Sequence, residues 1–356
     1  MEENYYYILG IFFVAALGFS LIINRILLKF VKTLGIRNQQ GTVIRWSASS
    51  KPALGGISFY IIFLFSIIMY PFEREVSGCF IHPQTLGIFA ASTIGFLLGL
   101  FDDAYNTKPW LKFFSQVACG VVLIATGIYI KIFDNEILNY TISIFWVVGI
   151  MNAINLLDNM DAISAIVSIG ILLGIIAMLI FSSELNHKMA FLIIGVLAAL
   201  IGFLFYNWHP SKMYMGDTGS QFLGVFLAGI GIVFLWNGPN SEGESSSWMQ
   251  VTGVLMAFAL PIIDTTTVFI KRILKGGSPF VGGKDHTTHH LGYLGLKDNH
   301  VAMVFALLSI IFSGLAFVIF EFITFTNLKS LFYFWGFFLI VFISMFIIAN
   351  KNKHLN

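Results

Sequence analysis

Charged residues are scarce in this sequence, and so are cysteines. Only 11% of the 356 residues are charged, against about a quarter in ordinary soluble domains, whereas 57% are hydrophobic. The longest polar segments, 25–52 and 271–299, are too short for a separate soluble domain, so we expect one membrane domain over residues 1–356. The two cysteines, Cys79 and Cys119, lack metal-ligand spacing and do not meet in the expected topology, which excludes a disulfide framework.

A signal peptide and a barrel pattern are also missing. The N-terminal residues MEENYYY contain no basic n-region, so the first hydrophobic run is expected to be retained. Segments of about ten alternating residues, which a bacterial membrane barrel requires, do not occur. Because backbone polar groups in lipid must be bonded internally, the sequence predicts a bundle of membrane helices.

Long hydrophobic runs are what the sequence has in abundance. Each is near the length of about 20 residues that a helix needs to cross a hydrocarbon core about 30 Å thick. We therefore predict an all-α polytopic membrane protein with eleven transmembrane helices, over residues 5–24, 53–72, 84–101, 113–132, 141–157, 162–181, 189–206, 221–237, 249–270, 301–320 and 331–349.

The charged residues orient this bundle and indicate where its chemistry lies. With eleven spans, sixteen of the 20 lysines and arginines fall on one side, which the positive-inside rule makes cytoplasmic, with the N-terminus outside and the C-terminus inside. All glutamates fall outside. The cytoplasmic side instead carries eight aspartates, a segregation that indicates a metal or phosphate site at this border: Asp102, Asp103, Asp158, Asp161, Asp217, Asp264, Asp285 and Asp298.

Two adjacent carboxylates, Asp102 and Asp103, close the run 84–101. Adjacent side chains point in different directions, so one is expected to reach a metal or substrate while the other orients a partner. The alternative is a pair of interfacial charges beside Lys108 and Lys112, although the C-terminus of a helix disfavours anions.

The segment NAINLLDNMD places four polar residues three apart, at Asn152, Asn155, Asp158 and Asp161. This spacing puts them close to one stripe of a helix and its continuing turn. Amides and carboxylates on one stripe suit hydrogen bonding to a base or sugar. The alternative is a polar seam between helices.

The segment MYMGDTGS places Asp217 between Gly216 and Gly219, directly before a hydrophobic run. Glycines allow the backbone to approach a ligand, and the N-terminus of a helix favours phosphate. Asp217 is the best single candidate for Mg²⁺, which prefers carboxylate oxygens together with substrate phosphates. The alternative is an ordinary helix cap formed by Asp217 or Thr218.

Three histidines, His286, His289 and His290, cluster beside Lys284 and Asp285. No cysteine or second cluster completes a zinc site, so phosphate binding or proton donation is the preferred interpretation. Asp264 is interpreted as a helix-bundle partner or a neighbour of a lipid phosphate. The other histidines, His209 among them, are interpreted as structural or surface residues. The spacing of Gly95 and Gly99 indicates close helix packing.

Taken in order, the motifs LGGISF, GLFDDAYN, NAINLLDNMDA, MYMGDTGS and DHTTHHL resemble those of the polyprenyl-phosphate N-acetylhexosamine-1-phosphate transferases, the MraY/WecA-type membrane enzymes, over residues 51–295. The resemblance implies transfer of a sugar-1-phosphate from a UDP-sugar to a polyprenyl phosphate, with release of UMP. It also implies a requirement for Mg²⁺, with Mn²⁺ as a substitute, and chemistry at the cytoplasmic face of the inner (plasma) membrane, with a homodimer as the suggested oligomer. We expect no nucleic-acid partner.

The same resemblance assigns roles by motif. Asp102, Asp103, His289 and His290 fall on catalytic positions, and Asp217 and Asp158 on metal-binding ones. Substrate binding falls on Lys51, Asn152, Asn155, Asp158, Asp161, Tyr214 and His286, with Tyr214 at the place of an aromatic near the uracil.

This chain departs from the family pattern at two motifs. The usual DGxDG reads Asp158-Asn159-Met160-Asp161-Ala162, so both glycines are replaced and the turn is expected to change. The histidine loop lacks three consecutive histidines, which favours the WecA/TagO branch and UDP-GlcNAc over UDP-MurNAc-pentapeptide.

From another class of protein, a secondary transporter of an anionic solute is the main alternative. Transporters place their sites near the midplane within repeats, which this sequence does not show.

Overall fold

The computed structural model describes residues 2–30, 51–69, 82–182, 189–238, 246–277 and 283–351. Throughout these ranges the secondary structure is helical, and the one extended pairing recorded there is an isolated parallel bridge between Ala53 and Tyr214. The expectation of an all-α fold is therefore confirmed for the described part of the chain.

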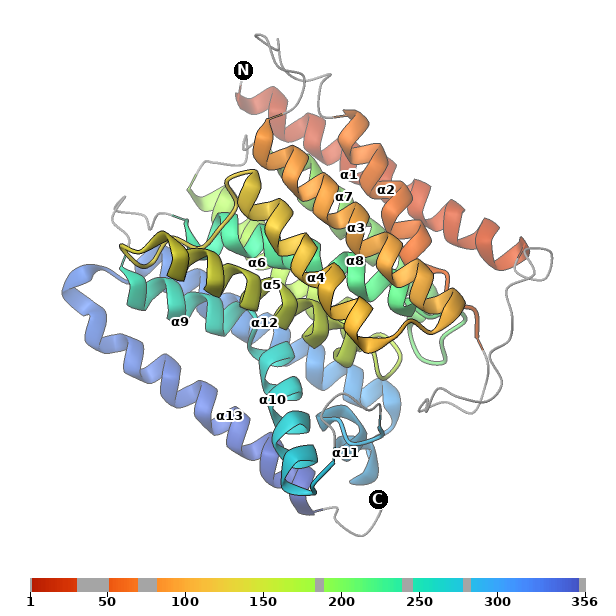
Figure 1. Cartoon of the computed structure of the whole chain (residues 1–356). Coiled ribbons are helices and arrows are strands. Elements are labelled where there is room, and N and C mark those ends of the chain that lie inside the picture. Colours follow the sequence, from red (N-terminus) through yellow and green to blue (C-terminus); the bar gives the residue numbers. More distant parts are fainter. Residues whose placement is uncertain are drawn as a thin grey trace.

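Thirteen α-helices form within the described residues (Figure 1). A π-helical turn, Ile232–Trp236, continues α8, and a 3₁₀ segment, Phe325–Ser330, precedes the last helix. The α-helices are α1 (Glu2–Phe30), α2 (Gly55–Met69), α3 (Pro83–Tyr105), α4 (Pro109–Ala125), α5 (Glu136–Leu157), α6 (Ile163–Phe181), α7 (Ala190–Asn207), α8 (Gly216–Gly231), α9 (Ser247–Ala257), α10 (Ala259–Leu274), α11 (Thr287–Tyr293), α12 (Asp298–Phe322) and α13 (Leu331–Lys351).

Eight helices in the described ranges are long and apolar enough to cross a membrane, or nine spans if the bent pair α9–α10 is counted as one. Two further apolar helices, α2 and α4, are shorter, at 15 and 17 residues. Each predicted hydrophobic run overlaps one of these helices or the bent pair. The multi-pass membrane architecture is thus confirmed, while the count of eleven spans stays a prediction.

The run 249–270 is not the single helix that its hydrophobicity predicted. The chain bends by 77° between α9 and α10, with Phe258 at the break in a non-helical conformation. Pro261 stands in the first turn of α10, where its missing N–H costs little; further along a continuous helix, its ring would clash with the carbonyl of Ala257. Local proline chemistry therefore overrides the continuous hydrophobic pattern.

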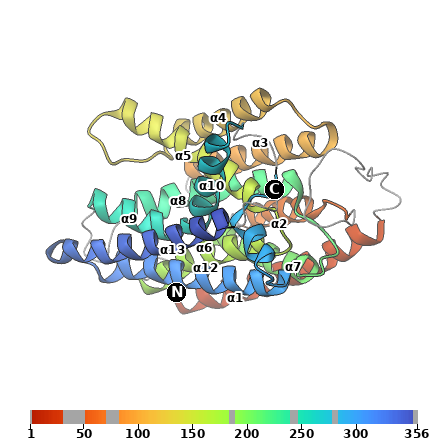
Figure 2. The same ribbon diagram turned by 90° about the horizontal axis from the view of Figure 1, so that it is seen from below.

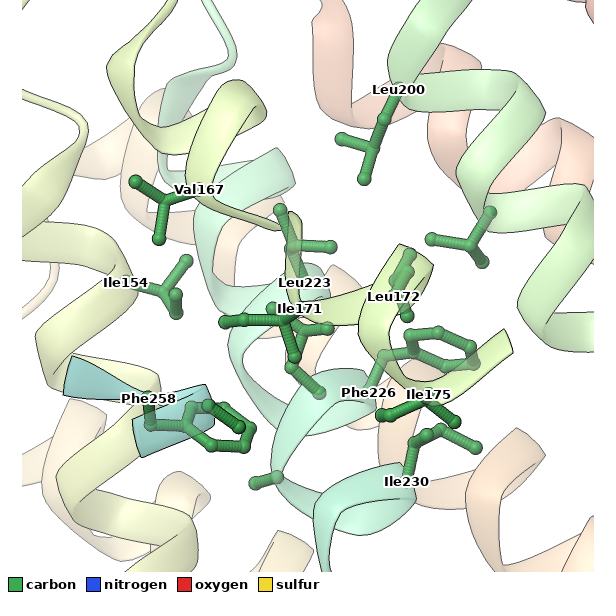
Figure 3. Close-up of a cluster of buried hydrophobic side chains, with 14 of the residues drawn as sticks. Ile154, Val167, Ile171, Leu172, Ile175, Leu200, Leu223, Phe226, Ile230 and Phe258 are labelled. Carbon is green, nitrogen blue, oxygen red and sulfur yellow. The ribbon is translucent and has the colours of Figure 1, made fainter. Parts of the chain in front are cut away.

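Helix α8 lies at the centre of the bundle, and its residues are buried from Thr218 to Gly231. Leu223 and Phe226 of α8 meet Ile171 of α6 and Ile154 of α5 in the apolar cluster of Figure 3. On its other side α8 packs closely against α3. A Cβ on Gly99 would lie 2.1 Å from the Asp217 carbonyl oxygen, which confirms the close packing predicted from the glycine spacing.

Candidate active site

Lys112 joins two of the predicted aspartates at the ends of three helices. Its Nζ lies 2.5 Å from Asp102 Oδ2 and 2.9 Å from Asp217 Oδ2. Asp102 closes α3, Lys112 lies in the first turn of α4, and Asp217 lies in the first turn of α8. The Asp217 side chain remains 34% exposed, whereas that of Asp102 is only 6% exposed. This arrangement presents one accessible carboxylate and one ammonium group to a ligand.

Thr107 holds the second oxygen of Asp102. Its backbone N–H and its hydroxyl both donate to Asp102 Oδ1, at 2.9 and 2.5 Å. The turn between α3 and α4 thus closes around Asp102. Within this turn, Asn106 adopts a left-handed φ of 52°. Asp102 is therefore fixed in place before any substrate arrives.

Asp103 caps a helix that is distant in sequence. Its carboxylate accepts hydrogen bonds from the backbone N–H groups of Asp217 and Thr218, at 3.0 and 2.9 Å, and from the Thr218 hydroxyl at 2.6 Å. These are among the N–H groups that the first turn of α8 leaves without helical partners. Of the two predicted orientations, Asp103 takes the one that orients a partner, because its contacts hold the turn that carries Asp217.

Asp103→Ala is therefore expected to destabilise the fold, whatever its effect on the reaction. Loss of a charged cap and its hydroxyl bond should lower the free energy of unfolding by about 2 kcal/mol. Thermal unfolding in detergent measures this, with Asp134→Ala, an exposed aspartate before α5, as the control. Equal unfolding temperatures of the two variants would contradict the capping role.

Two asparagines of the predicted stripe on α5, Asn155 and Asn152, make different contacts. Asn155 donates to Asp217 Oδ1 at 2.9 Å and to Ser220 Oγ at 2.8 Å, so it belongs to the polar centre. Asn152 instead donates to Gln116 Oε1 at 2.8 Å, and Gln116 in turn donates to Gln221 Oε1 at 3.1 Å. For Asn152 the structure therefore shows the polar seam between helices that the sequence left open as an alternative.

A second polar group surrounds Asp161, beyond the C-terminal end of α5. Ser211 donates to its carboxylate through its hydroxyl at 2.7 Å and its backbone N–H at 3.1 Å, and His209 Nδ1 lies 3.0 Å from Oδ2. Lys51 Nζ lies 3.6 Å from the same oxygen and 5.2 Å from the centre of the Tyr214 ring. The structure thus brings together three predicted substrate-binding residues that are far apart in the sequence.

The backbone explains why Lys51 reaches this group. Tyr214 N–H donates to the Pro52 carbonyl at 2.9 Å, and Gly55 N–H donates to the Tyr214 carbonyl at 3.1 Å. This short parallel pairing holds the start of α2 beside residues 211–217, the segment that also leads to Asp217. Both polar groups are therefore positioned by one stretch of chain.

In the turn after α5, both glycines of the family pattern are replaced, by Asn159 and Ala162. Asp158 caps the C-terminal end of α5, and Ala162 adopts a left-handed φ of 71°, a conformation that favours glycine. The Ala162 N–H donates to Asn207 Oδ1 at 2.9 Å, which holds the strained residue in place. A tertiary hydrogen bond thus supports Ala162 at one of the two replaced positions, and the expected change of the turn stays a prediction.

Helix α11 carries the histidine cluster, and α10 anchors it. Asp264, buried in α10, accepts hydrogen bonds from the Thr287 N–H at 2.8 Å and hydroxyl at 2.6 Å, and its Oδ2 lies 2.8 Å from His286 Nδ1. Of its two interpretations, Asp264 is the helix-bundle partner. Arg272 pairs with both oxygens of Asp285, at 2.8 and 2.7 Å.

The two remaining histidines of the cluster are buried. Burial lowers the pKa of His289 to about 3, with a contribution from the neighbouring His286. Burial and the ammonium group of Lys271, 2.6 Å from His290 Nε2, lower the pKa of His290 to about 4. With these pKa values both rings are neutral near pH 7, where they can act as hydrogen-bonding groups, and their role in proton donation stays a prediction.

The low pKa values predict how stability depends on pH. Below an ordinary histidine pKa of about 6.5, these histidines bind protons in the unfolded chain but not in the folded chain. The free energy of unfolding therefore decreases as the pH falls towards the lowered pKa values of the folded protein. For His289→Gln we expect the loss of stability between about pH 6 and pH 4 to become shallower by about 1.4 kcal/mol per pH unit. Chemical unfolding in detergent at several pH values measures the slope, and an unchanged slope would contradict a buried neutral ring.

The donor set at the centre suits a small divalent cation. Within the described residues no three His, Cys, Asp or Glu side chains gather as a metal site. Mg²⁺, however, commonly uses only one or two carboxylates together with substrate phosphates and water. Lys112, a cation held by the carboxylates of Asp102 and Asp217, stands in for such an ion, so the residues present fit the predicted metal.

Sequence reasoning missed several members of the site. Lys112 appeared only as an interfacial charge, although its position in the first turn of a helix on the aspartate-rich side was a signal for a phosphate or carboxylate partner. Ser211 and His209 carried no signal, because their role depends on the fold bringing them to Asp161.

The fold and these two polar groups define a polytopic membrane protein with a charged site where several helices end. A family model described as glycosyl transferase family 4 matches residues 85–235. Over 277 residues the chain is 30% identical to the probable undecaprenyl-phosphate N-acetylglucosaminyl 1-phosphate transferase of Bacillus subtilis (strain 168), covering 75% of this chain and 73% of the relative.

Two further relatives carry related names. The decaprenyl-phosphate N-acetylglucosaminephosphotransferase of Mycobacterium leprae (strain TN) is 26% identical over 280 residues, covering 71% of this chain and 69% of the relative. The phospho-N-acetylmuramoyl-pentapeptide-transferase of Staphylococcus carnosus (strain TM300) is 31% identical over 304 residues, covering 77% and 86%. The chain belongs to glycosyl transferase family 4, and the resemblance seen in its motifs is confirmed.

Proposed function

We propose that this protein transfers GlcNAc-1-phosphate from UDP-GlcNAc to undecaprenyl (polyprenyl) phosphate, giving polyprenyl-diphospho-GlcNAc and UMP for cell-envelope polysaccharide synthesis. The observation that carries the proposal is the Lys112 ammonium group between Asp102 and the accessible Asp217. Two phosphorylated substrates must approach each other in this reaction, so the site has to neutralise their negative charge.

Different residues are proposed to bind the nucleotide and the phosphates of the donor. Lys51, Asp161 and Tyr214 form the group proposed to bind the nucleotide, with the Tyr214 ring available for the uracil. Lys112, once released from either Asp102 or Asp217, is proposed to hold phosphate oxygens. A phosphate monoester has a second pKa of about 6, so the acceptor is largely dianionic at pH 7, and any need for Asp102 as a base is small.

Asp217, with Asp158 at the end of α5, is proposed to hold Mg²⁺, for which Mn²⁺ can substitute. When bound, the ion supplies charge neutralisation to the diphosphate. Asn155 orients the Asp217 carboxylate through Oδ1, and Asp103 holds the turn beneath it. His286, at the N-cap of α11, and His289 and His290 within α11 are proposed to contact phosphate oxygens or the sugar.

The membrane setting of the proposal follows from the charge distribution. We infer eleven spans with the N-terminus outside and the C-terminus in the cytoplasm, in the inner (plasma) membrane, with the active site on the cytoplasmic face. The excess of lysine and arginine on that side supports this orientation. A homodimer is the proposed oligomer.

Incubation of the purified protein with undecaprenyl phosphate, Mg²⁺ and separate UDP-N-acetylhexosamines tests the proposal, with UMP and lipid-linked product as readouts. Metal-dependent release of UMP with UDP-GlcNAc supports it. Release only with another donor, UDP-MurNAc-pentapeptide included, would keep the reaction and overturn the sugar. No release with any donor from well-folded protein would favour a transporter, which releases no UMP.

A further inference from the structure

The helix α11 is attached to two different parts of the molecule. Towards α10 it is held by Asp264, and Lys271 of α10 lies 2.6 Å from His290 Nε2. Lys271 also donates to the Ala349 carbonyl at 2.8 Å, near the C-terminal end of α13. Helices α10, α11 and α13 are therefore connected; α10 and α11 lie below α5 in Figure 1, and Figure 2 shows α10 between α5 and α13.

A separate contact joins α11 to the turn after α5. The Thr288 hydroxyl donates to Asn159 Oδ1 at 2.5 Å. The amide group of Asn159 is itself oriented, because its Nδ2 donates to the Leu156 carbonyl at 2.8 Å. Thr288 is fully buried and Asn159 is half-buried, so this hydrogen bond is partly shielded from water.

Asn159 stands where the family pattern has a glycine. A glycine has no side chain and cannot make the bond to Thr288, so this contact belongs to the particular residues of this chain. The neighbours of Asn159 in sequence, Asp158 and Asp161, are two of the aspartates proposed to bind metal and nucleotide. The hydrogen bond thus lies between these aspartates and the histidine-bearing helix.

We propose that Asn159 and Thr288 are positioning residues that lock α11 onto the α5–α6 turn and so set the distance between the histidines and the donor-binding aspartates. Neither side chain touches the substrate in this proposal, which rests on the proposed function for its catalytic consequence. The 77° bend at Phe258 separates α10 from α9, so α10 and α11 depend on such lateral contacts for their placement. A change of about 1 Å in the distance between the histidines and these aspartates can lower turnover strongly.

Hydrogen–deuterium exchange of the purified, substrate-free full-length protein tests the lock directly. Asn159→Ala and Thr288→Val should each speed exchange of the amides in 287–293 by about tenfold, as expected for loss of one buried hydrogen bond. Because both variants break the same bond, the double variant should also show about tenfold rather than a hundredfold. Thr141→Val, which removes an exposed threonine hydroxyl bond within α5, is the matched control and should leave 287–293 unchanged.

Unchanged exchange in the single variants, or effects that multiply in the double variant, would overturn the lock. Because no substrate is present, this result does not depend on the reaction. With UDP-GlcNAc and undecaprenyl phosphate, both variants should lower kcat by about tenfold with a smaller change in KM. Faster exchange with unchanged kcat in an active enzyme would overturn the positioning role while leaving the proposed function intact.

Discussion

Asp217→Asn is expected to lower turnover by about a thousandfold, the size of effect seen when a group that stabilises transition-state charge is removed. Asparagine preserves the shape of the side chain and one oxygen for the hydrogen bond from Asn155. It removes the negative charge that a divalent cation requires. It also leaves Lys112 with Asp102 as its remaining carboxylate partner. Initial rates of UMP release across a range of Mg²⁺ concentrations measure the loss.

Asp134→Asn provides the matched control, because Asp134 is an exposed aspartate in the turn before α5 and has the same change of charge. Its turnover should remain within about twofold of the parent, as for surface substitutions away from special features. Near-normal turnover of Asp217→Asn would refute the assignment of the metal to this residue. Recovery of its activity at high Mg²⁺ would instead show weakened metal binding.

Lys112→Met is expected to separate cation binding from catalysis. Loss of the ammonium group should lower turnover by about a hundredfold or more, because the phosphate oxygens lose a positive partner. At the same time, Asp102 and Asp217 lose the cation that they share, so a divalent cation should bind about tenfold more tightly to the substrate-free protein. Titration of Mn²⁺ followed by electron paramagnetic resonance measures the binding independently of activity.

Lys108→Met is the control for this prediction, since Lys108 is exposed one turn earlier and makes no side-chain cap bond. It should change neither turnover nor Mn²⁺ affinity appreciably. Weaker Mn²⁺ binding by Lys112→Met would contradict the view that Lys112 occupies the place of the cation. Lys112→Arg should keep part of the activity, because the charge is retained while the geometry differs.

The polar centre was only partly predictable from the motifs. Asp102 and Asp217 were recognised because carboxylates at the ends of hydrophobic runs are costly and therefore informative. Asn152 and Asn155 looked equivalent, since both lie on the same stripe of α5. Their different roles depend on Gln116 and Ser220, which come from other helices and meet them only after packing.

Local signals for helix ends were reliable in some places and misleading in others. A cap at Asp217 or Thr218 was a reasonable interpretation, yet the capping carboxylate belongs to Asp103, 114 residues earlier in the chain. The break at Phe258 was hidden within the predicted hydrophobic run 249–270, because the cost of Pro261 depends on its place in the helix.

By itself, the sequence determined the membrane class and the approximate helices, since hydrophobic length acts locally along the chain. The orientation of the bundle stays a prediction from the placement of charge. The sequence also contained the motifs that the relatives share. Only the tertiary structure decided which contacts each aspartate makes: Asp103 caps α8, whereas Asp217 keeps an accessible carboxylate. The reason is physical: Lys112, Asp103, Asn159 and Ser211 acquire their roles through short polar contacts between segments distant in sequence, and no local pattern encodes such distances.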